Sequence, residues 1–356
     1  MQKTGIADLP LHYGRSPRWL FEKMKILSRE IITAIISDRG VDELLRKISD
    51  PLWFQAFGCV LGFDWHSSGL TTTVCGAMKE GVKGIEKELG LFIAGGKGKV
   101  SLRTPSEIIT LSEIARVDPE RLVYASKMSA KVDSAALQDG FTLYHHCFIF
   151  TSSGRWAVIQ QGMNEETGYA RRYHWIGEKV KDFVCEPHHA ICSDWKGEGL
   201  NMVAKESQKA RELCTILSKE KPSVIIKELQ RITRLKMPKH HTLFLERVRP
   251  DRFEKALKEA YNQSPQNFEK LLGIRGVGAK TIRALALISD LVYGAKPSFK
   301  DPATYSFAHG GKDGHPYPVD KKTYQESILS LHQALMEAKI GRSEKIKALK
   351  RLRTFL

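Results

Sequence analysis

A glycine corner that opens a helix is the feature that most constrains the fold of this chain. Gly276 and Gly278 flank the single apolar residue Val277, and apolar residues then recur with helical spacing as far as Tyr293. Glycine permits the sharp backbone reversal and the close approach of a ligand that larger residues obstruct. A helix that starts here directs its first backbone amides, and the positive end of its dipole, outward. The sequence therefore predicts two helices joined by a tight turn whose amides face an oxyanion such as phosphate.

This corner resembles the helix-hairpin-helix element of DNA repair and replication proteins. The Gly-Val-Gly core with Lys280 just after it carries the resemblance. It implies a contact with the sugar-phosphate backbone that does not read the base sequence. An ordinary corner inside an apolar core is the alternative. The DNA contacts expected here are Arg275, Gly276, Val277, Gly278, Lys280 and Thr281.

The charge of the chain also favours an anionic partner. Its 356 residues include 56 Lys or Arg against 40 Asp or Glu, a formal net charge of +16. Such an excess is typical of proteins that bind nucleic acid or an anionic membrane surface. No apolar run approaches the roughly 20 residues that span a bilayer, and no segment of the signal-peptide type is found. We therefore expect a cytoplasmic protein without a membrane contact, with DNA or RNA as its polyanion. The glycine corner favours DNA, single-stranded or branched.

Two kinds of hydrophobic pattern divide the chain. Aromatic and β-branched residues at 141–150 and 156–161, separated by a Ser-Ser-Gly-Arg turn, predict a β-hairpin among helices. From about residue 200 the pattern is helical and punctuated by prolines. We expect an α+β domain with a small antiparallel sheet over residues 1–199, which carries the candidate catalytic site. An all-α helix-hairpin-helix domain that binds DNA is expected over residues 200–356.

Acidic residues stand beside histidines at several places in the N-terminal half. Carboxylates and imidazoles bind Mg²⁺, Mn²⁺ or Zn²⁺, and such ions polarise a phosphodiester or activate water. Loop hydrogen bonds and helix caps are the alternative roles. His145 and His146 point to opposite faces of a strand, so at most one of them joins a given site. The candidate metal ligands are Asp64, His66, Asp139 and His188, and the candidate catalytic residues are Asp64, His66, Asp133, Asp139, His145 and Gln161.

The six cysteines give no metal motif of their own. All of them precede residue 215, none forms a CxxC pair, and their spacings match no structural zinc pattern. We therefore expect reduced thiols that are buried as small apolar side chains.

The order of residues around the predicted hairpin suggests a reaction. Asp139 is followed by a strand, a turn, a second strand and the Gln160–Gln161 pair. This order resembles the core of restriction-type nucleases, in which a lysine follows the second acid by two residues. Gly162 and Met163 occupy those positions here. With the predicted DNA contact, the acid–histidine pairs lead to the hypothesis of a metal-dependent nuclease acting on DNA repair or recombination intermediates.

Arg171 and Arg172 are followed directly by a tyrosine, a histidine and a tryptophan. Interleaved cations and aromatic rings can hold phosphates and stack on bases, so both arginines are candidate DNA contacts. The alternative is a surface strand whose aromatic side chains face the core. The pattern does not decide between the two.

The corner is also similar to the corresponding segment of the endonuclease III-like glycosylase superfamily, in which a lysine attacks the sugar C1′ and a later aspartate assists. The resemblance implies Lys280 as nucleophile and Asp320 as the assisting residue. A helix N-terminus disfavours positive charge and so helps to activate a lysine. The insertion between the two residues is longer than in that superfamily. A glycosylase or abasic-site lyase is therefore an alternative function, and a non-enzymatic structural DNA binder is another.

Two further motifs extend along the chain. Thr-Gly-Ile-Ala-Asp-Leu-Pro-Leu-His occupies residues 4–12, and Phe-Asp-Trp-His-Ser-Ser-Gly occupies residues 63–69. They identify the chain as a member of a prokaryotic, largely archaeal, family of unknown function. The resemblance covers nearly the whole chain and implies no activity.

Overall fold

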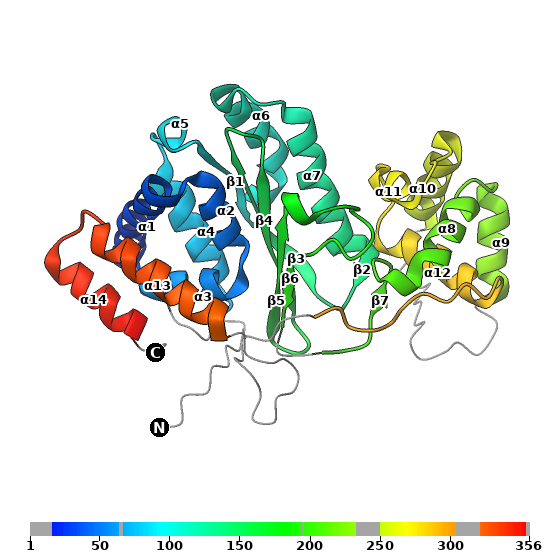
Figure 1. The fold of residues 1–356 in the computed structure, drawn as a ribbon. Coiled ribbons are helices and arrows are strands. Elements are labelled where there is room, and N and C mark those ends of the chain that lie inside the picture. Colours follow the sequence, from blue (N-terminus) through cyan, green and yellow to red (C-terminus); the bar gives the residue numbers. More distant parts are fainter. Residues whose placement is uncertain (1–15, 64–66, 194–195, 233–249, 304–320, 354–356) are drawn as a thin grey trace.

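An antiparallel sheet of five strands lies at the centre of the molecule (Figure 1). The computed structural model describes residues 16–63, 67–193, 196–232, 250–303 and 321–353. The strand order is β1–β3–β4–β5–β6, with all neighbours antiparallel. The predicted mixed α+β class with an antiparallel sheet is therefore confirmed. The strands are β1 (Leu91–Lys97), β3 (Thr142–Thr151), β4 (Trp156–Asn164), β5 (Tyr169–Ile176) and β6 (Ala190–Cys192), while β2 (Leu137–Gln138) and β7 (Leu200–Asn201) form a separate pair.

The predicted β-hairpin is confirmed as β3 and β4. Phe150 pairs with Trp156 across the turn, and the pairing continues with one irregularity to Thr142 and Met163. Alternation along β3 sends Cys147 and Ile149 into one apolar cluster and Phe148 and Phe150 into another. The sheet is thus buried on both faces, and His145 and His146 point to different faces as predicted.

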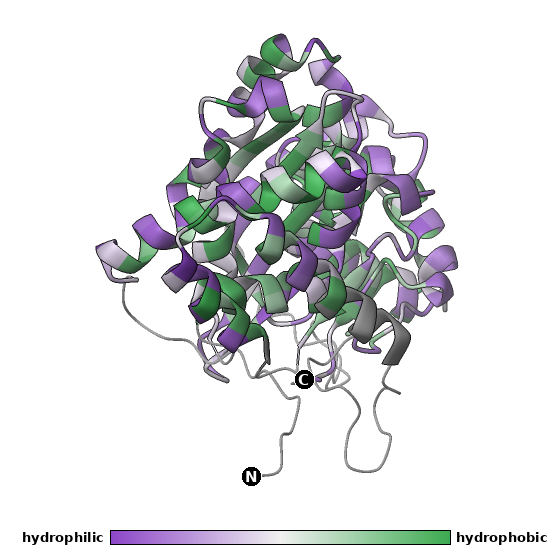
Figure 2. Ribbon diagram, turned by 60° about the vertical axis from the view of Figure 1, so that its left-hand side comes forward, coloured by the Kyte–Doolittle hydropathy of each residue, from purple (hydrophilic) through white to green (hydrophobic). Residues whose placement is uncertain are grey.

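Four N-terminal helices cover the face that carries Cys147 (Figure 1), and hydrophobic residues gather in the interior of the molecule (Figure 2). The aromatic stretch that starts at Pro51 forms one of them, and every residue of this helix is buried. Asp50 accepts a hydrogen bond from the backbone amide of Trp53 (2.8 Å) and begins that helix, while Gly62, at φ 106°, ends it. The helices of this layer are α1 (Arg18–Arg39), α2 (Val41–Ser49), α3 (Pro51–Leu61) and α4 (Gly69–Val82), with the short α5 (Glu86–Leu89) leading into β1.

The apolar side chains on the opposite face of the sheet pack in one cluster with those of the helices after residue 200. Phe148 of the sheet and Leu285 are members of the same cluster. One core therefore joins the sheet to helices that the sequence pattern assigned to a second domain. The helices on this side are α6 (Thr104–Ala115), α7 (Pro119–Lys131), α8 (Gln208–Leu217), α9 (Pro222–Ile232), α10 (Pro250–Gln263), α11 (Phe268–Gly273) and α12 (Ala279–Leu291).

The last two helices, α13 (Lys321–Glu337) and α14 (Arg342–Arg353), return to the N-terminal layer (Figure 1). Leu331, Leu335 and Leu352 are buried in the same cluster as the apolar residues of α1 and α3. The predicted range 200–356 therefore contains two groups of helices that pack into different cores. Sequence order did not indicate this, because the apolar face of a helix does not specify its partner.

Candidate functional site

Asp133 lies at the centre of a buried polar network on the face of the sheet covered by α7. Its Oδ2 accepts hydrogen bonds from Gln160 Nε2 (2.5 Å) and from the Trp175 indole (2.9 Å). Its Oδ1 lies 2.5 Å from His188 Nε2. The structure thus brings together two residues predicted for catalysis or metal binding, Asp133 and His188, but as hydrogen-bond partners of each other; Asp133 is fully buried and His188 is partly buried.

The network continues from Gln160 to a serine that the sequence did not single out. Gln160 Oε1 accepts a hydrogen bond from His146 Nδ1 (2.8 Å), because the amide nitrogen of Gln160 already donates to Asp133. His146 Nε2 therefore accepts from Ser126 Oγ (2.9 Å). Burial lowers the pKa of His146. Each named side chain is partnered, which makes this network a rigid internal support.

Asp139 is held in a buried ion pair. Its Oδ2 accepts from Arg171 Nη1 (2.9 Å) and from the Tyr173 hydroxyl (2.8 Å), and its Oδ1 from the Phe141 amide (3.2 Å). Arg171 Nη2 donates to Asp301 Oδ2 (2.8 Å). Burial raises the pKa of the Asp139 carboxyl, and Arg171 acts in the opposite direction. Arg171 is 0% exposed, so the prediction of a surface DNA contact for it is wrong.

Arg172 points to the other face of the sheet, because neighbouring residues of a strand alternate. Its Nη2 donates to Gln55 Oε1 (2.7 Å), and its guanidinium lies 4.8 Å from the ring centroid of Phe54. Burial lowers the pKa of Arg172 to about 10. This side chain is also 0% exposed, and its predicted DNA contact is wrong for the same reason. As in the alternative, the aromatic side chains of Tyr173 and Trp175 are buried, but their strand lies inside the sheet and not at the surface.

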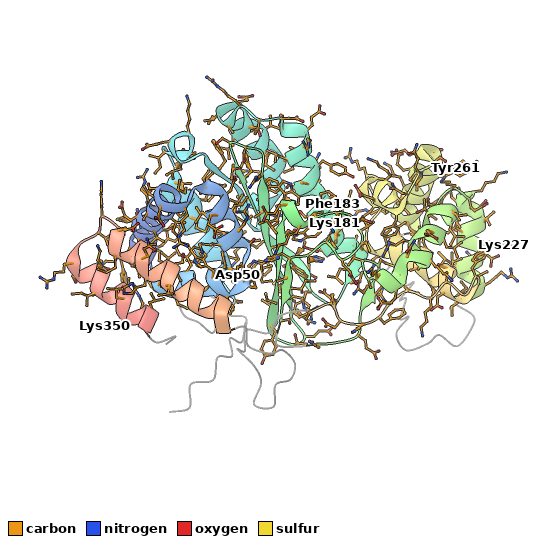
Figure 3. All side chains as sticks on the ribbon, viewed as in Figure 1. Asp50, Lys181, Phe183, Lys227, Tyr261 and Lys350 are labelled. Carbon is orange, nitrogen blue, oxygen red and sulfur yellow. The ribbon has the colours of Figure 1, made fainter. Side chains whose placement is uncertain are left out.

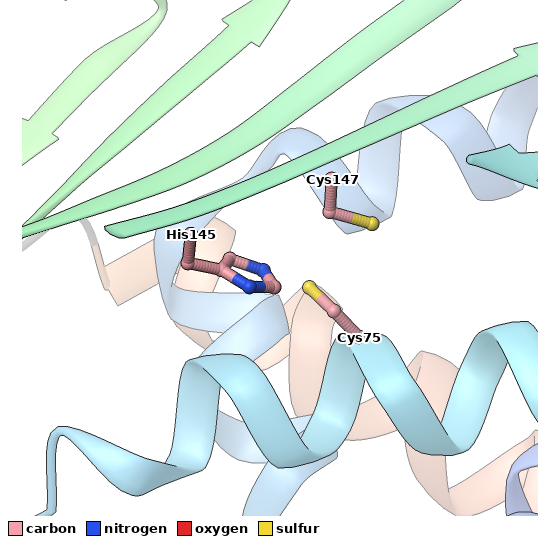
Figure 4. Close-up of side chains that lie close together, drawn as sticks. All are labelled: Cys75, His145 and Cys147. Atoms are coloured by element: carbon pink, nitrogen blue, oxygen red, sulfur yellow. The ribbon is translucent and has the colours of Figure 1, made fainter. Parts of the chain in front are cut away.

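Two cysteines and a predicted catalytic histidine converge on the same face as Arg172 (Figure 4). The sulfurs of Cys75 and Cys147 and a ring nitrogen of His145 all lie within 4.8 Å of one another. Burial lowers the pKa of His145 to about 3 and raises that of the Cys75 thiol well above its ordinary value. Among the described residues, these three side chains form a group that could hold a metal ion. The group could hold a divalent metal ion, but of its members only His145 was predicted for a site, as a catalytic residue. The predicted ligands Asp139 and His188 lie in other hydrogen-bonded groups, and Asp64 and His66 lie outside the described residues.

The predicted glycine corner joins α11 to α12. Gly276 has φ 93°, a left-handed conformation that favours glycine, whereas Gly278 is extended at φ −141°. Arg275 and Lys280 are exposed. Val277 and Thr281 were also predicted to contact DNA, but these residues are 0% and 3% exposed, so neither offers a surface for that contact.

The corner is attached rigidly to the sheet side of the molecule. Lys131, the last residue of α7, donates from Nζ to the backbone oxygens of Val277 and Ile274, the latter at 3.4 Å. Gln138 Nε2 donates to the backbone oxygen of Ala279 (2.8 Å). These bonds occupy carbonyl groups of the turn. In the described part of the chain, the backbone amides of Gly276, Gly278 and Ala279 donate no hydrogen bond.

The comparison with known proteins identifies the family. The family described as "Protein of unknown function (DUF763)" matches residues 5–319. The chain belongs to the DUF763 family. No curated protein and no solved structure matches it. The DUF763 match includes both faces of the sheet and the corner, and it ends just before α13. No helix in the described ranges of this DUF763 protein is long and apolar enough to cross a bilayer.

The catalytic residues predicted for this DUF763 protein do not form one constellation. Asp133 and Asp139 lie on the face of the sheet that carries Tyr173, whereas His145 and Gln161 lie on the other. Lys280 lies on α12, beyond the sheet. Three further candidates, Asp64, His66 and Asp320, lie outside the described residues.

The two glycines of the DUF763 corner are expected to differ in their tolerance of a side chain. Gly276→Ala forces a β-carbon into the left-handed region and should lower the free energy of unfolding by about 1–2 kcal/mol. Gly278→Ala should be close to neutral, because its backbone is extended and no heavy atom lies within 4 Å of the new β-carbon. Urea denaturation of both variants measures the difference. Equal unfolding midpoints would contradict this account of the turn.

Proposed function

We propose that this DUF763 protein binds DNA through the sugar-phosphate backbone, with the corner between α11 and α12 as the contact. The observation that carries the proposal is the open space at Gly278, directly before α12 and between the exposed Arg275 and Lys280. A phosphate needs backbone amides that it can approach closely, together with neighbouring positive charge. The corner offers both on one short segment.

The fixed geometry of the turn supports this proposal. Lys131 and Gln138 hold the carbonyl side of the corner, while the amides of Gly276 and Gly278 have no partner in the described structure. A ligand that binds such a segment loses little free energy in ordering it. Contacts of this kind reach phosphates rather than base edges, so binding would not depend on sequence.

The charge of the chain supports the same partner. A net charge of +16 attracts a polyanion over several ångströms, and neutralised phosphates release counterions. Affinity for DNA should therefore fall steeply as salt concentration rises. Lys270, which is exposed on α11, adds a third cation beside Arg275 and Lys280.

The decisive experiment places a side chain where the phosphate would lie. Gly278→Val should weaken binding of a fluorescent single-stranded or branched oligonucleotide by about tenfold, because the new methyl groups occupy open space outside the fold. Gly341→Val is the matched control. Gly341 also precedes a helix, its carbonyl also accepts the first helical hydrogen bond at 3.0 Å, and its surroundings are equally open. Both variants should keep the unfolding midpoint of the parent protein.

A charge reversal gives an independent measurement on the same surface. Lys280→Glu should weaken binding and reduce its salt dependence, whereas Lys350→Glu on the distant helix α14 changes the net charge equally with little effect (Figures 1 and 3). Parent-like affinity in both Gly278→Val and Lys280→Glu would refute the proposal that the corner is the contact.

The two enzymatic hypotheses both assume this DNA contact, and each is tested by a separate experiment. A metal-dependent nuclease requires cleavage of labelled repair or recombination intermediates that stops when EDTA is added. A lyase that uses Lys280 requires a covalent adduct with abasic DNA after borohydride reduction. A structural binder shows salt-sensitive binding with neither product.

A further inference from the structure

We infer that Cys75, His145 and Cys147 form a zinc site that fixes helix α4 to strand β3. Their donor atoms all lie within 4.8 Å of one another. Ligands of tetrahedral zinc, bound at about 2.0–2.3 Å, lie roughly 3.3–3.8 Å apart. The donor atoms therefore need to approach one another by at most about 1–1.5 Å to close the site. This inference is independent of the proposed DNA contact.

The fold brings the three side chains together from two elements (Figure 4). His145 and Cys147 are two residues apart in β3 and therefore share a face of the sheet. Cys75 lies on α4, which packs over that face, and Figure 4 shows its sulfur directed toward the other two side chains. All three residues are 1–2% exposed. A metal ion bound here would link the N-terminal helical layer to the sheet.

The hydrogen bonding of His145 supports a bound metal ion independently of the distances between the donor atoms. Neither of its ring nitrogens has a hydrogen-bond partner, although the side chain is buried. An unsatisfied buried polar group costs about 1–3 kcal/mol, so native structures seldom retain one. His146, the next residue, has partners at both nitrogens on the other face, namely Gln160 and Ser126. A metal ion would satisfy His145 as those side chains satisfy His146.

The chemistry of the donors selects the metal. Two sulfurs and an imidazole nitrogen suit Zn²⁺, whereas Mg²⁺ and Ca²⁺ require oxygen ligands. One further acceptor lies on the same face. Oε1 of Gln161 is buried without a hydrogen-bond partner, and the Cα of Gln161 pairs in register with that of His145. The group therefore offers three ligands. The oxygen of Gln161 could be a fourth ligand or could accept a hydrogen bond from a water bound to the metal. Because all three side chains are buried, a metal ion here would stabilise the fold and would be poorly accessible to a substrate.

Metal analysis of the full-length protein tests this inference. Protein purified without chelators should contain about one zinc per chain, and Cys147→Ser should reduce that content at least tenfold. Cys214→Ser is the matched control, because Cys214 is also a buried free cysteine but lies in the other apolar cluster. It should keep its zinc. Replacement of zinc by Co²⁺ should produce the absorption of thiolate bound to cobalt in the parent protein and not in Cys147→Ser.

Several results would overturn the inference. One is parent protein that binds neither zinc nor Co²⁺, and another is equal zinc in Cys147→Ser and the parent. A third is fewer than six titratable thiols in unreduced protein denatured with EDTA, together with a peptide map that joins Cys75 to Cys147. If Cys147→Ser fails to fold, the Co²⁺ titration and the thiol count of the parent protein decide the question without it.

Discussion

Asp139→Ala should lower the free energy of unfolding by about 3–5 kcal/mol. The carboxylate of Asp139 forms an ion pair with the Arg171 guanidinium, and it also accepts from the Tyr173 hydroxyl. Both Asp139 and Arg171 are buried, so the substitution removes a carboxylate that balances a positive charge in the interior. A buried charge that loses its partner is far more costly than an exposed one. Urea denaturation of the full chain measures the change.

An exposed pair of the same chemistry serves as the control. Asp38 forms a 3.0 Å ion pair with Arg39 at the end of α1, and both side chains are exposed. Asp38→Ala should change the free energy of unfolding by less than about 1 kcal/mol. A similar midpoint for the parent protein and Asp139→Ala would show that the ion pair is not structural, and would return Asp139 to consideration as a metal ligand.

The sequence predicted the helices and strands that depend on a pattern of neighbouring residues. The alternating residues of β3 and β4 and the helical residues after the glycine corner each carry their own period, so the hairpin and the pair α11–α12 were found close to their observed bounds. The opposite orientation of His145 and His146 followed from the same period. Patterns of this kind depend on neighbouring residues alone.

The sequence did not predict which side chains meet. Asp133 bonds to His188, which lies 55 positions later, and Cys75 meets His145 from a helix 70 residues earlier. Acid–histidine proximity along the chain was therefore a poor guide to a site, because strand alternation and packing choose the partners. The spacing of His145 and Cys147 within a predicted strand was a usable signal. The third member of the group, Cys75, is brought to them only by the packing of α4 on the sheet.

Leu335→Ala should lower the free energy of unfolding by about 2–5 kcal/mol. Leu335 is 0% exposed on α13 and belongs to the apolar cluster of α1 and α3. Removing its side chain leaves a cavity between the last helices and the first. Leu329→Ala on the same helix is the control, because Leu329 is 67% exposed, and it should change the free energy by less than about 0.5 kcal/mol.

Tryptophan fluorescence makes this measurement specific to the N-terminal part of the chain. All six tryptophans precede residue 200, and Trp53 lies in α3 within the cluster that contains Leu335. If residues 200–356 unfolded as a separate unit, Leu335→Ala would leave the fluorescence transition unchanged. The packing of α13 on α1 and α3 instead requires that transition to move to lower urea, because the cavity lies in the core that contains Trp53. A shift seen by circular dichroism but not by fluorescence would contradict the return of the last helices to the N-terminal layer.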